Sequence, residues 1–173
     1  AHGGNPDAWT MVSEVEAPRG DEDRFVWQEG EREAYRQLMG SYLTGPYWDV
    51  RFLTFEGPVE KRAEEYHVHL GPSSDYPEVT HQLPEAAPGD SLAEPAARAI
   101  ADSVVQARYG KDLSVLERVG AEPTALPNRR DWTFTYADTT GYPMDEGEAR
   151  LTVDLAGSEV TNASPEVHVP ESW

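Results

Sequence analysis

The sequence predicts an α+β fold built from two repeated modules, each with one helix followed by about three antiparallel strands. Three observations support this prediction. The same order of helix-type and strand-type patterns occurs twice, each round spans roughly 70–80 residues, and a proline-rich segment separates the rounds. We therefore divide the chain into an irregular lead-in at 1–30, a first module at 31–85 and a second module at 91–173.

The lead-in contains several glycines and prolines and an acidic run at 21–23, which together predict little regular structure. Two short apolar stretches within it, residues 11–17 and 24–28, are candidates for short strands.

The first module begins with a predicted helix over residues 31–43, where Tyr35, Leu38, Met39 and Tyr42 repeat at helical spacing. The sequence Thr44-Gly45-Pro46 should end it. Two strands follow, and in both of them apolar and polar residues alternate. The alternating positions are Trp48, Val50 and Phe52 against Asp49 and Arg51, then Tyr66, Val68 and Leu70 against Glu65, His67 and His69.

The second module begins with a predicted helix over residues 92–109. Ser91 and Glu94 have the spacing of a capping box, Pro95 is tolerated in the first turn, and Gly110 should end the helix. Strands with period-two apolar patterns follow, and we expect the helix of each module to cover one face of its sheet. The alternating apolar positions of these strands are Trp132, Phe134, Tyr136, Leu151, Val153, Leu155, Val167 and Val169.

The charge balance excludes some partners. The chain has 14 basic and 32 acidic side chains, a formal net charge of −18, which argues against nucleic acid and against direct binding to an anionic membrane. An acidic, solubilising surface and a surface for a cationic partner both remain open. The chain has no cysteine, which excludes a disulfide framework, and no apolar run long enough to span a bilayer, so we expect a soluble segment. It starts without methionine and stops directly after a predicted strand, so we expect it to be part of a longer protein.

The sharpest candidate for chemistry is the pair His67 and His69, which share a strand face, with His81 on a neighbouring strand as a third zinc ligand. The alternative is that these imidazoles are the solvent side of a sheet. We predict no catalytic residue, no cofactor and no metal in this segment, with His67, His69 and His81 as weak metal candidates. Acidic residues around one loop are a weaker calcium candidate without regular ligand spacing: Asp138, Asp145, Glu146 and Glu148.

The aromatic residues of the second module allow two interpretations. Trp132, Phe134 and Tyr136 line a binding groove or, as is commoner for aromatics at period two, belong to the core. We include them with His67 and His69 as a candidate contact patch. Neither a nucleophile elbow nor a phosphate-binding loop occurs.

Several segments resemble a known family. The strand at 131–134, the turn-containing stretch at 153–160 and the stretch at 167–173 resemble PepSY-like modules, a helix followed by an antiparallel meander. The series over residues 45–173 looks like the extracytoplasmic segment that precedes the membrane-embedded part of CPBP-family proteins, the CAAX-protease and bacteriocin-processing group of intramembrane metalloproteases.

The resemblance implies that catalysis lies elsewhere. In the family, the metal-binding glutamates and histidines lie on transmembrane helices in an EExxxR pattern. Glu64 and Glu65 are paired, but no arginine follows four residues after Glu65, and no catalytic role is carried over. The resemblance thus implies a non-catalytic, periplasmic sensing, regulatory or substrate-recruiting domain. Its partners would be the membrane-embedded remainder of the same chain and a peptide or protein substrate. The alternative is a small-molecule or cation-binding module unrelated to proteolysis.

Overall fold

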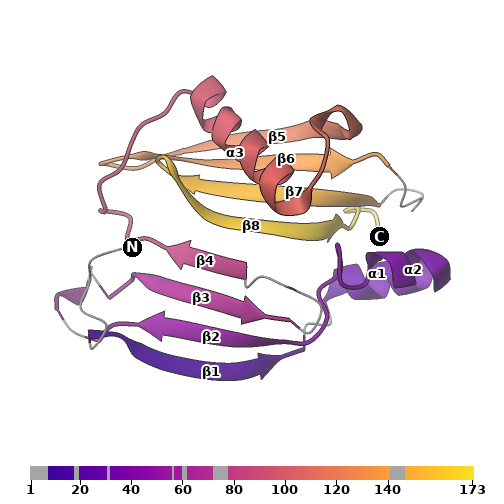
Figure 1. The fold of residues 1–173 in the computed structure, drawn as a ribbon, viewed down its shortest axis with the longest axis horizontal. Helices are drawn as coiled ribbons and strands as arrows, with labels where there is room; N and C mark the ends of the chain where they lie inside the picture. Colours follow the sequence, from indigo (N-terminus) through magenta and orange to yellow (C-terminus); the bar gives the residue numbers. More distant parts are fainter. Residues whose placement is uncertain are drawn as a thin grey trace.

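The computed structural model describes residues 8–17, 20–30, 32–55, 57–59, 62–71, 78–140 and 147–173. The strands of these residues form two four-stranded antiparallel sheets (Figure 1). The first sheet contains, in spatial order, β1 (Thr10–Glu16), β2 (Tyr47–Leu53), β3 (Glu65–Leu70) and β4 (Glu78–Gln82). The second contains β5 (Leu116–Ala125), β6 (Arg130–Asp138), β7 (Glu148–Ala156) and β8 (Glu159–His168). The α+β class is confirmed, with four strands in each sheet in place of three.

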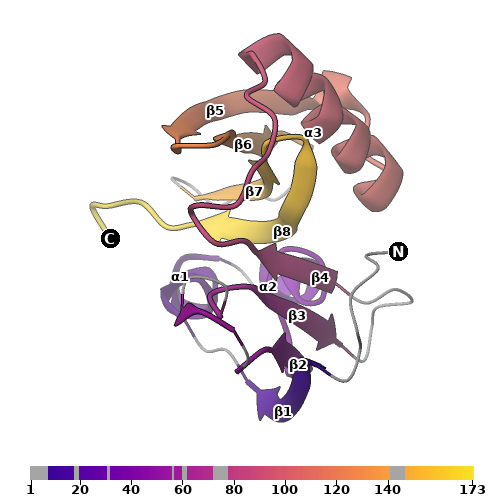
Figure 2. The same cartoon turned by 90° about the vertical axis from the view of Figure 1, so that its left-hand side faces the viewer.

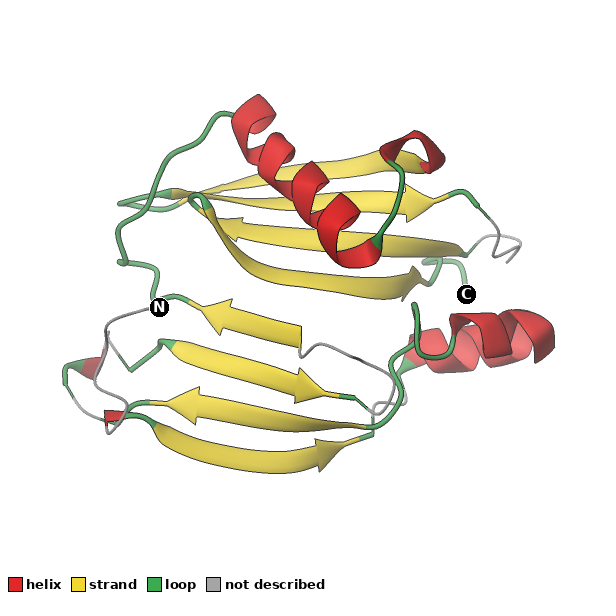
Figure 3. Cartoon of the chain, in the orientation of Figure 1, coloured by secondary structure: helices red, strands yellow, loops and turns green. Residues whose placement is uncertain are grey.

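Three α-helices occur in the described residues, α1 (Asp21–Glu29), α2 (Arg32–Leu38) and α3 (Glu94–Tyr109) (Figure 3). A 3-10 turn, η3 (Leu113–Val115), precedes β5. The predicted irregular lead-in is wrong, because it contains β1 and α1. The stretch at 11–17 does form most of a strand, but 24–28 is helical. Phe25 and Val26 are buried on one side of α1, and three acidic residues in its first turn suit the positive end of the helix dipole.

The helix predicted over 31–43 is shorter than expected. It ends at Leu38, whose carbonyl accepts hydrogen bonds from the amides of Tyr42 and Leu43 in a tight turn. Gly40 has a φ of 83°, a conformation that glycine adopts at little cost. Tyr42 therefore reaches the core from the turn and not from the helix.

The second sheet is covered on one face by α3, as predicted. Trp132, Phe134 and Tyr136 point toward this helix and are 7%, 0% and 0% exposed, so their inclusion in a contact patch is wrong and the core interpretation is confirmed. The predicted capping box is also wrong: α3 begins at Glu94, and its N-cap, Ala93, makes no side-chain cap. Gly110 does end the helix, with a φ of 62°.

The hydrophobic core belongs to the second sheet, and the N-terminal helices contribute to it. Residues of α1, α2 and the turn after α2 join the buried cluster formed by α3, β6, β7 and β8: Phe25, Val26, Leu38, Tyr42 and Leu43. No described residue of the first sheet belongs to this cluster. The prediction that the first helix covers the first sheet is therefore wrong. Instead, α1 and α2 lie beyond one end of its strands, near β8 (Figure 1).

A buried carboxylate fixes this arrangement. The side chain of Asp138, at the end of β6, is completely buried and accepts hydrogen bonds from the Tyr42 hydroxyl at 2.6 Å and the Lys111 ammonium at 2.6 Å. Thr140 adds its amide at 2.9 Å and its hydroxyl at 2.5 Å. Burial alone would raise the pKa of Asp138, but these donors stabilise the carboxylate and hold the pKa well below its usual value.

The two sheets meet edge to edge, with β4 beside β8 (Figure 2). Among the described residues, no backbone hydrogen bond joins these strands. Side chains make the junction. The Nδ1 of His81 lies 2.6 Å from a carboxylate oxygen of Glu159, its Nε2 lies 3.2 Å from Glu64, and the Thr80 hydroxyl lies 3.4 Å from the amide oxygen of Asn162.

The connection between the sheets is also held by side chains. Arg129 is 4% exposed and donates hydrogen bonds to the carbonyls of Pro84 and Ala87 and to the carboxylate of Asp131. The proline-rich segment between the two modules is thereby anchored to the start of β6.

Candidate functional site

The polar face of the first sheet carries a cluster of one carboxylate and two imidazoles. Antiparallel pairing of β2 with β3 places Asp49 opposite His69. His67, which pairs with Arg51, lies diagonally across from Asp49, and all three side chains are on one face of the sheet. The Oδ1 of Asp49 lies 3.3 Å from the Nδ1 of His67 and 3.6 Å from the Nε2 of His69. One ligand atom from each residue lies within 4.8 Å of the other two. We call Asp49, His67 and His69 the carboxylate–imidazole cluster.

The cluster is partly shielded from water. Asp49 is 8% exposed, and the two imidazoles are 26% and 28% exposed. Burying a carboxylate away from water costs free energy unless charged or hydrogen-bonding partners surround it. Here the nearest partners are the two imidazoles, so Asp49 depends on them or on a cation between them.

A second pair of charges supports His67 from the other side. The Nε2 of His67 lies 3.3 Å from Glu65, and Arg51 donates a hydrogen bond of 2.9 Å to the same carboxylate. The hydrogen bond from Arg51 contributes most to lowering the pKa of Glu65, so this side chain is an anion at neutral pH. His67 is thus bracketed at both ring nitrogens by carboxylates.

The surroundings of the cluster are negative. The ring of Tyr47 lies 4.5 Å from that of His69. Burial raises the pKa of Tyr47, and the charges of Asp49, Glu16 and Glu78 raise it further. A neutral phenol is favoured by the same local potential that attracts a cation.

His81, the third metal candidate, does not join this cluster. It pairs with Tyr66 in the β3–β4 register and therefore lies on the opposite face, with its ring stacked on Tyr66 at a centroid distance of 3.9 Å. It is 6% exposed and binds Glu64 and Glu159. The three-histidine set considered from the sequence is therefore not formed, and His81 belongs to the junction between the sheets.

The opposite face of the first sheet is apolar and open to solvent. Five large apolar side chains on it are between 45% and 62% exposed: Met11, Val15, Trp48, Leu70 and Val79. We call these five residues the apolar face. Contiguous exposed apolar side chains in a soluble protein indicate an interaction surface more often than isolated ones do.

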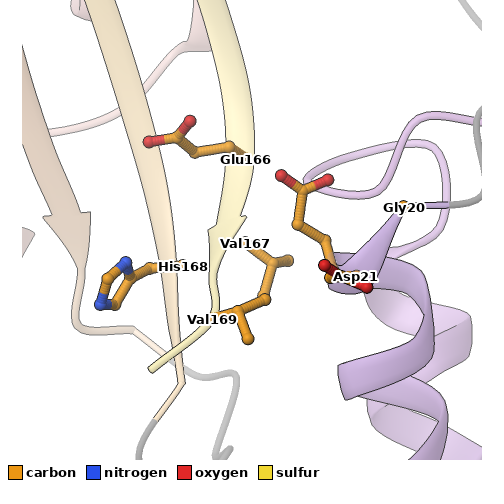
Figure 4. Close-up of a pocket in the computed structure, with 7 residues that line it drawn as sticks. Gly20, Asp21, Glu166, Val167, His168 and Val169 are labelled. Atoms are coloured by element: carbon orange, nitrogen blue, oxygen red, sulfur yellow. The ribbon is translucent and has the colours of Figure 1, made fainter. Parts of the chain in front are cut away.

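A pocket lies elsewhere, between the start of α1 and the end of β8 (Figure 4). It encloses about 370 Å³ and is lined by Gly20, Asp21, Glu22, Glu166, Val167, His168 and Val169. Burial raises the pKa of Glu22, and the nearby charge of Glu166 adds to the effect. The acidic lining disfavours an anionic ligand. Its carboxylates lie among exposed surface residues, and no further feature of the described lining indicates a ligand.

The weaker calcium candidate finds no support in the described residues. Asp138 is occupied by Lys111, and Glu148 pairs with Arg150 at 2.8 Å. Asp145 and Glu146 lie outside the described residues.

No pattern in the sequence pointed directly to Asp49 as a partner of the histidines. Alternation put Asp49 on the polar side of its strand, but only the register between β2 and β3 brings it beside His69. The available signal was an acidic residue at the centre of a strand whose one other charged residue is Arg51.

Comparison of the chain with protein-family models, curated proteins and solved structures finds no match. No helix in the described part of the chain is long and apolar enough to cross a membrane.

Proposed function

We propose that this chain is a non-catalytic, extracytoplasmic sensing or regulatory domain of a membrane-bound CPBP-type protease, in which it recruits substrate or tunes activity. The observation that carries the proposal is the first sheet, in which neither face is covered by a described helix and one face exposes five large apolar side chains. A sheet of this kind offers a broad surface for a polypeptide partner.

The arrangement of elements supports a PepSY-like assignment. In both halves a helical segment precedes an antiparallel meander, α1 and α2 before β2–β4 and α3 before β5–β8. The halves differ in that β1 precedes the helices of the first, so the repeat is inexact. The partner would be the membrane-embedded remainder of the same protein or a peptide substrate, and the net charge of −18 disfavours nucleic acid and anionic lipid.

Site-specific crosslinking in the full-length protein tests this proposal. A photo-crosslinking amino acid at Trp48, on the apolar face, should capture the membrane-embedded part or a peptide substrate. The matched control is the same amino acid at Ser103, an exposed position on α3, which should capture neither. Equal yields at both positions, or a full-length sequence without membrane-spanning segments bearing EExxxR, would contradict the proposal.

The polar face favours a second candidate function, binding of a small cationic ligand without any link to proteolysis. The observation behind it is the carboxylate–imidazole cluster and its negative surroundings. Retention of the Trp48 crosslink would favour the first function, and cation binding without any crosslink would favour the second.

A further inference from the structure

We propose that Asp49, His67 and His69 form a binding site for a divalent transition-metal ion of the zinc class on the polar face of the first sheet. The inference specifies the ligand in the second candidate function and does not depend on the relation to a protease. It departs from the expectation, drawn from the sequence alone, that this segment holds no metal.

The spacing of the ligand atoms suits such an ion. Metal–ligand bonds of about 2.0–2.2 Å at tetrahedral angles place neighbouring ligand atoms about 3.3–3.6 Å apart. The Oδ1 of Asp49 lies 3.3 Å from one imidazole nitrogen and 3.6 Å from the other. One ring nitrogen of His67 and one of His69 lie within 4.8 Å of each other. Two edges of the coordination triangle therefore already have the required length.

The backbone holds this spacing. His67 and His69 are two residues apart on β3, so their side chains leave the same face of the sheet. Asp49 is hydrogen-bonded into the adjacent strand through the register that pairs it with His69. A site on two paired strands keeps its ligands in place better than one on loops.

The donor set selects the class of ion. Imidazole nitrogens with one carboxylate suit zinc and neighbouring transition metals, whereas calcium and magnesium require oxygen ligands throughout. Three protein ligands on a face open to solvent leave room for water or an external ligand.

An outer carboxylate orients one of the ligands. With the Nε2 proton of His67 directed at Glu65, 3.3 Å away, Nδ1 carries the lone pair that faces Asp49. Arg51 fixes Glu65 in turn. This chain of arginine, carboxylate and imidazole has the form of the outer shell that supports metal-bound histidines.

The competing explanation is that the two imidazoles are charged and serve only as ion-pair partners of Asp49. The two explanations predict different responses to added metal. Metal ions bind imidazole through its unprotonated nitrogen, so protons compete with the metal and metal affinity should fall in acid. A simple ion pair takes up no metal at any pH.

Titration with Zn²⁺ against a chromophoric chelator, and with Co²⁺ followed by absorption, tests the site in the whole chain. The titrations use a His2→Ala background, which removes the imidazole at the N-terminus. We expect one ion per chain and the visible bands of four-coordinate Co²⁺. Asp49→Asn, His67→Ala and His69→Ala should abolish stoichiometric binding, and Glu65→Gln should weaken it by about 10–100-fold.

Two matched variants serve as controls. His168→Ala removes an imidazole and Asp154→Asn a carboxylate, both from the second sheet, and both should bind like the parent. Far-UV circular dichroism checks that each variant is folded. If a cluster variant unfolds, the ¹⁵N chemical shifts of the imidazoles in the parent test the site instead. Zn²⁺ should change the shifts of His67 and His69 and leave those of His81 and His168 unchanged.

Absence of stoichiometric binding by the parent would overturn the inference. Unchanged affinity in Asp49→Asn and His69→Ala, or shifts confined to His81 and His168, would do the same. These outcomes leave the crosslinking result at Trp48 unaffected, so failure of the metal site and failure of the protease-linked function can be told apart.

Discussion

Removal of the Asp138 carboxylate should destabilise the protein strongly, because this one group joins the N-terminal helices to the second sheet. Its side chain has no exposure and accepts four hydrogen bonds from Tyr42, Lys111 and Thr140. Breaking a buried ion pair by removing one partner costs about 3–5 kcal/mol. For a chain of this size, about 2–4 °C in Tm accompanies each kcal/mol, so Asp138→Ala should lower Tm by about 6–20 °C.

Acid should remove the difference in unfolding free energy between the parent and Asp138→Ala. The pKa of Asp138 is lowered by folding, so its contribution is fully present above the unfolded value of about 3.9 and is lost as the pH falls toward the folded pKa. The gap in unfolding free energy between the parent and Asp138→Ala should therefore be constant from pH 7 to 5 and narrow below about pH 3.9.

Urea denaturation followed by tryptophan fluorescence measures this gap at each pH. Tyr42→Phe removes a single hydrogen bond to the carboxylate and should cost about 1.5–3 kcal/mol. Glu122→Gln, at an exposed acidic residue, is the control and should stay within about 0.5 kcal/mol of the parent. A loss below about 1 kcal/mol in Asp138→Ala, or a gap that persists unchanged to pH 2.5, would refute the reasoning.

Three further predictions concern the backbone, the connection and the two sheets. Gly157→Ala should cost more in unfolding free energy than Gly110→Ala: both glycines have positive φ, but a Cβ at 157 meets a backbone amide at 2.7 Å and one at 110 meets nothing within 4 Å. Equal losses in chemical denaturation would contradict this. Arg129→Met should lower the unfolding free energy by about 3–5 kcal/mol and speed limited proteolysis of the segment that connects the two sheets. An unchanged cleavage rate would show that Arg129 does not anchor this segment. Phe134→Ala should lower the unfolding free energy by about 3–5 kcal/mol because Phe134 is buried, and Trp48→Ala should lower it by less than about 1 kcal/mol because Trp48 is 53% exposed. Similar shifts in Tm for the two variants would argue against an open apolar face on the first sheet.

The faces of the strands were predictable from the sequence, because a period of two decides which side chains share a face. The alternation of Trp48 with Asp49, and of Tyr66 with His67, is found in the structure as predicted. The same pattern put Phe134 on one strand face with Trp132 and Tyr136 but left open whether that face is core or contact surface, and the structure shows that Phe134 is fully buried.

The partners of the helices were not predictable in the same way. The apolar stripe that includes Leu38 predicted burial, and Leu38 is buried, but a stripe does not specify which sheet it covers. Proximity in sequence favoured the first sheet, whereas Tyr42 bonds to Asp138, 96 residues away. The composition of the carboxylate–imidazole cluster escaped prediction for a related reason, since Asp49 joins it only through the register between strands.

The shared core has a consequence for the order in which the chain can fold. Phe25 and Val26 are buried in a core whose strands, β6 to β8, follow them by more than 100 residues, and Trp173 closes the arrangement by packing edge-on against Phe25 and donating a hydrogen bond to Glu29. A chain synthesised from its N-terminus must therefore hold its first apolar helix unburied until β8 is available. Contacts of such high sequence separation slow folding and make it cooperative, so the first sheet, none of whose described residues belongs to the core cluster, acquires its support last.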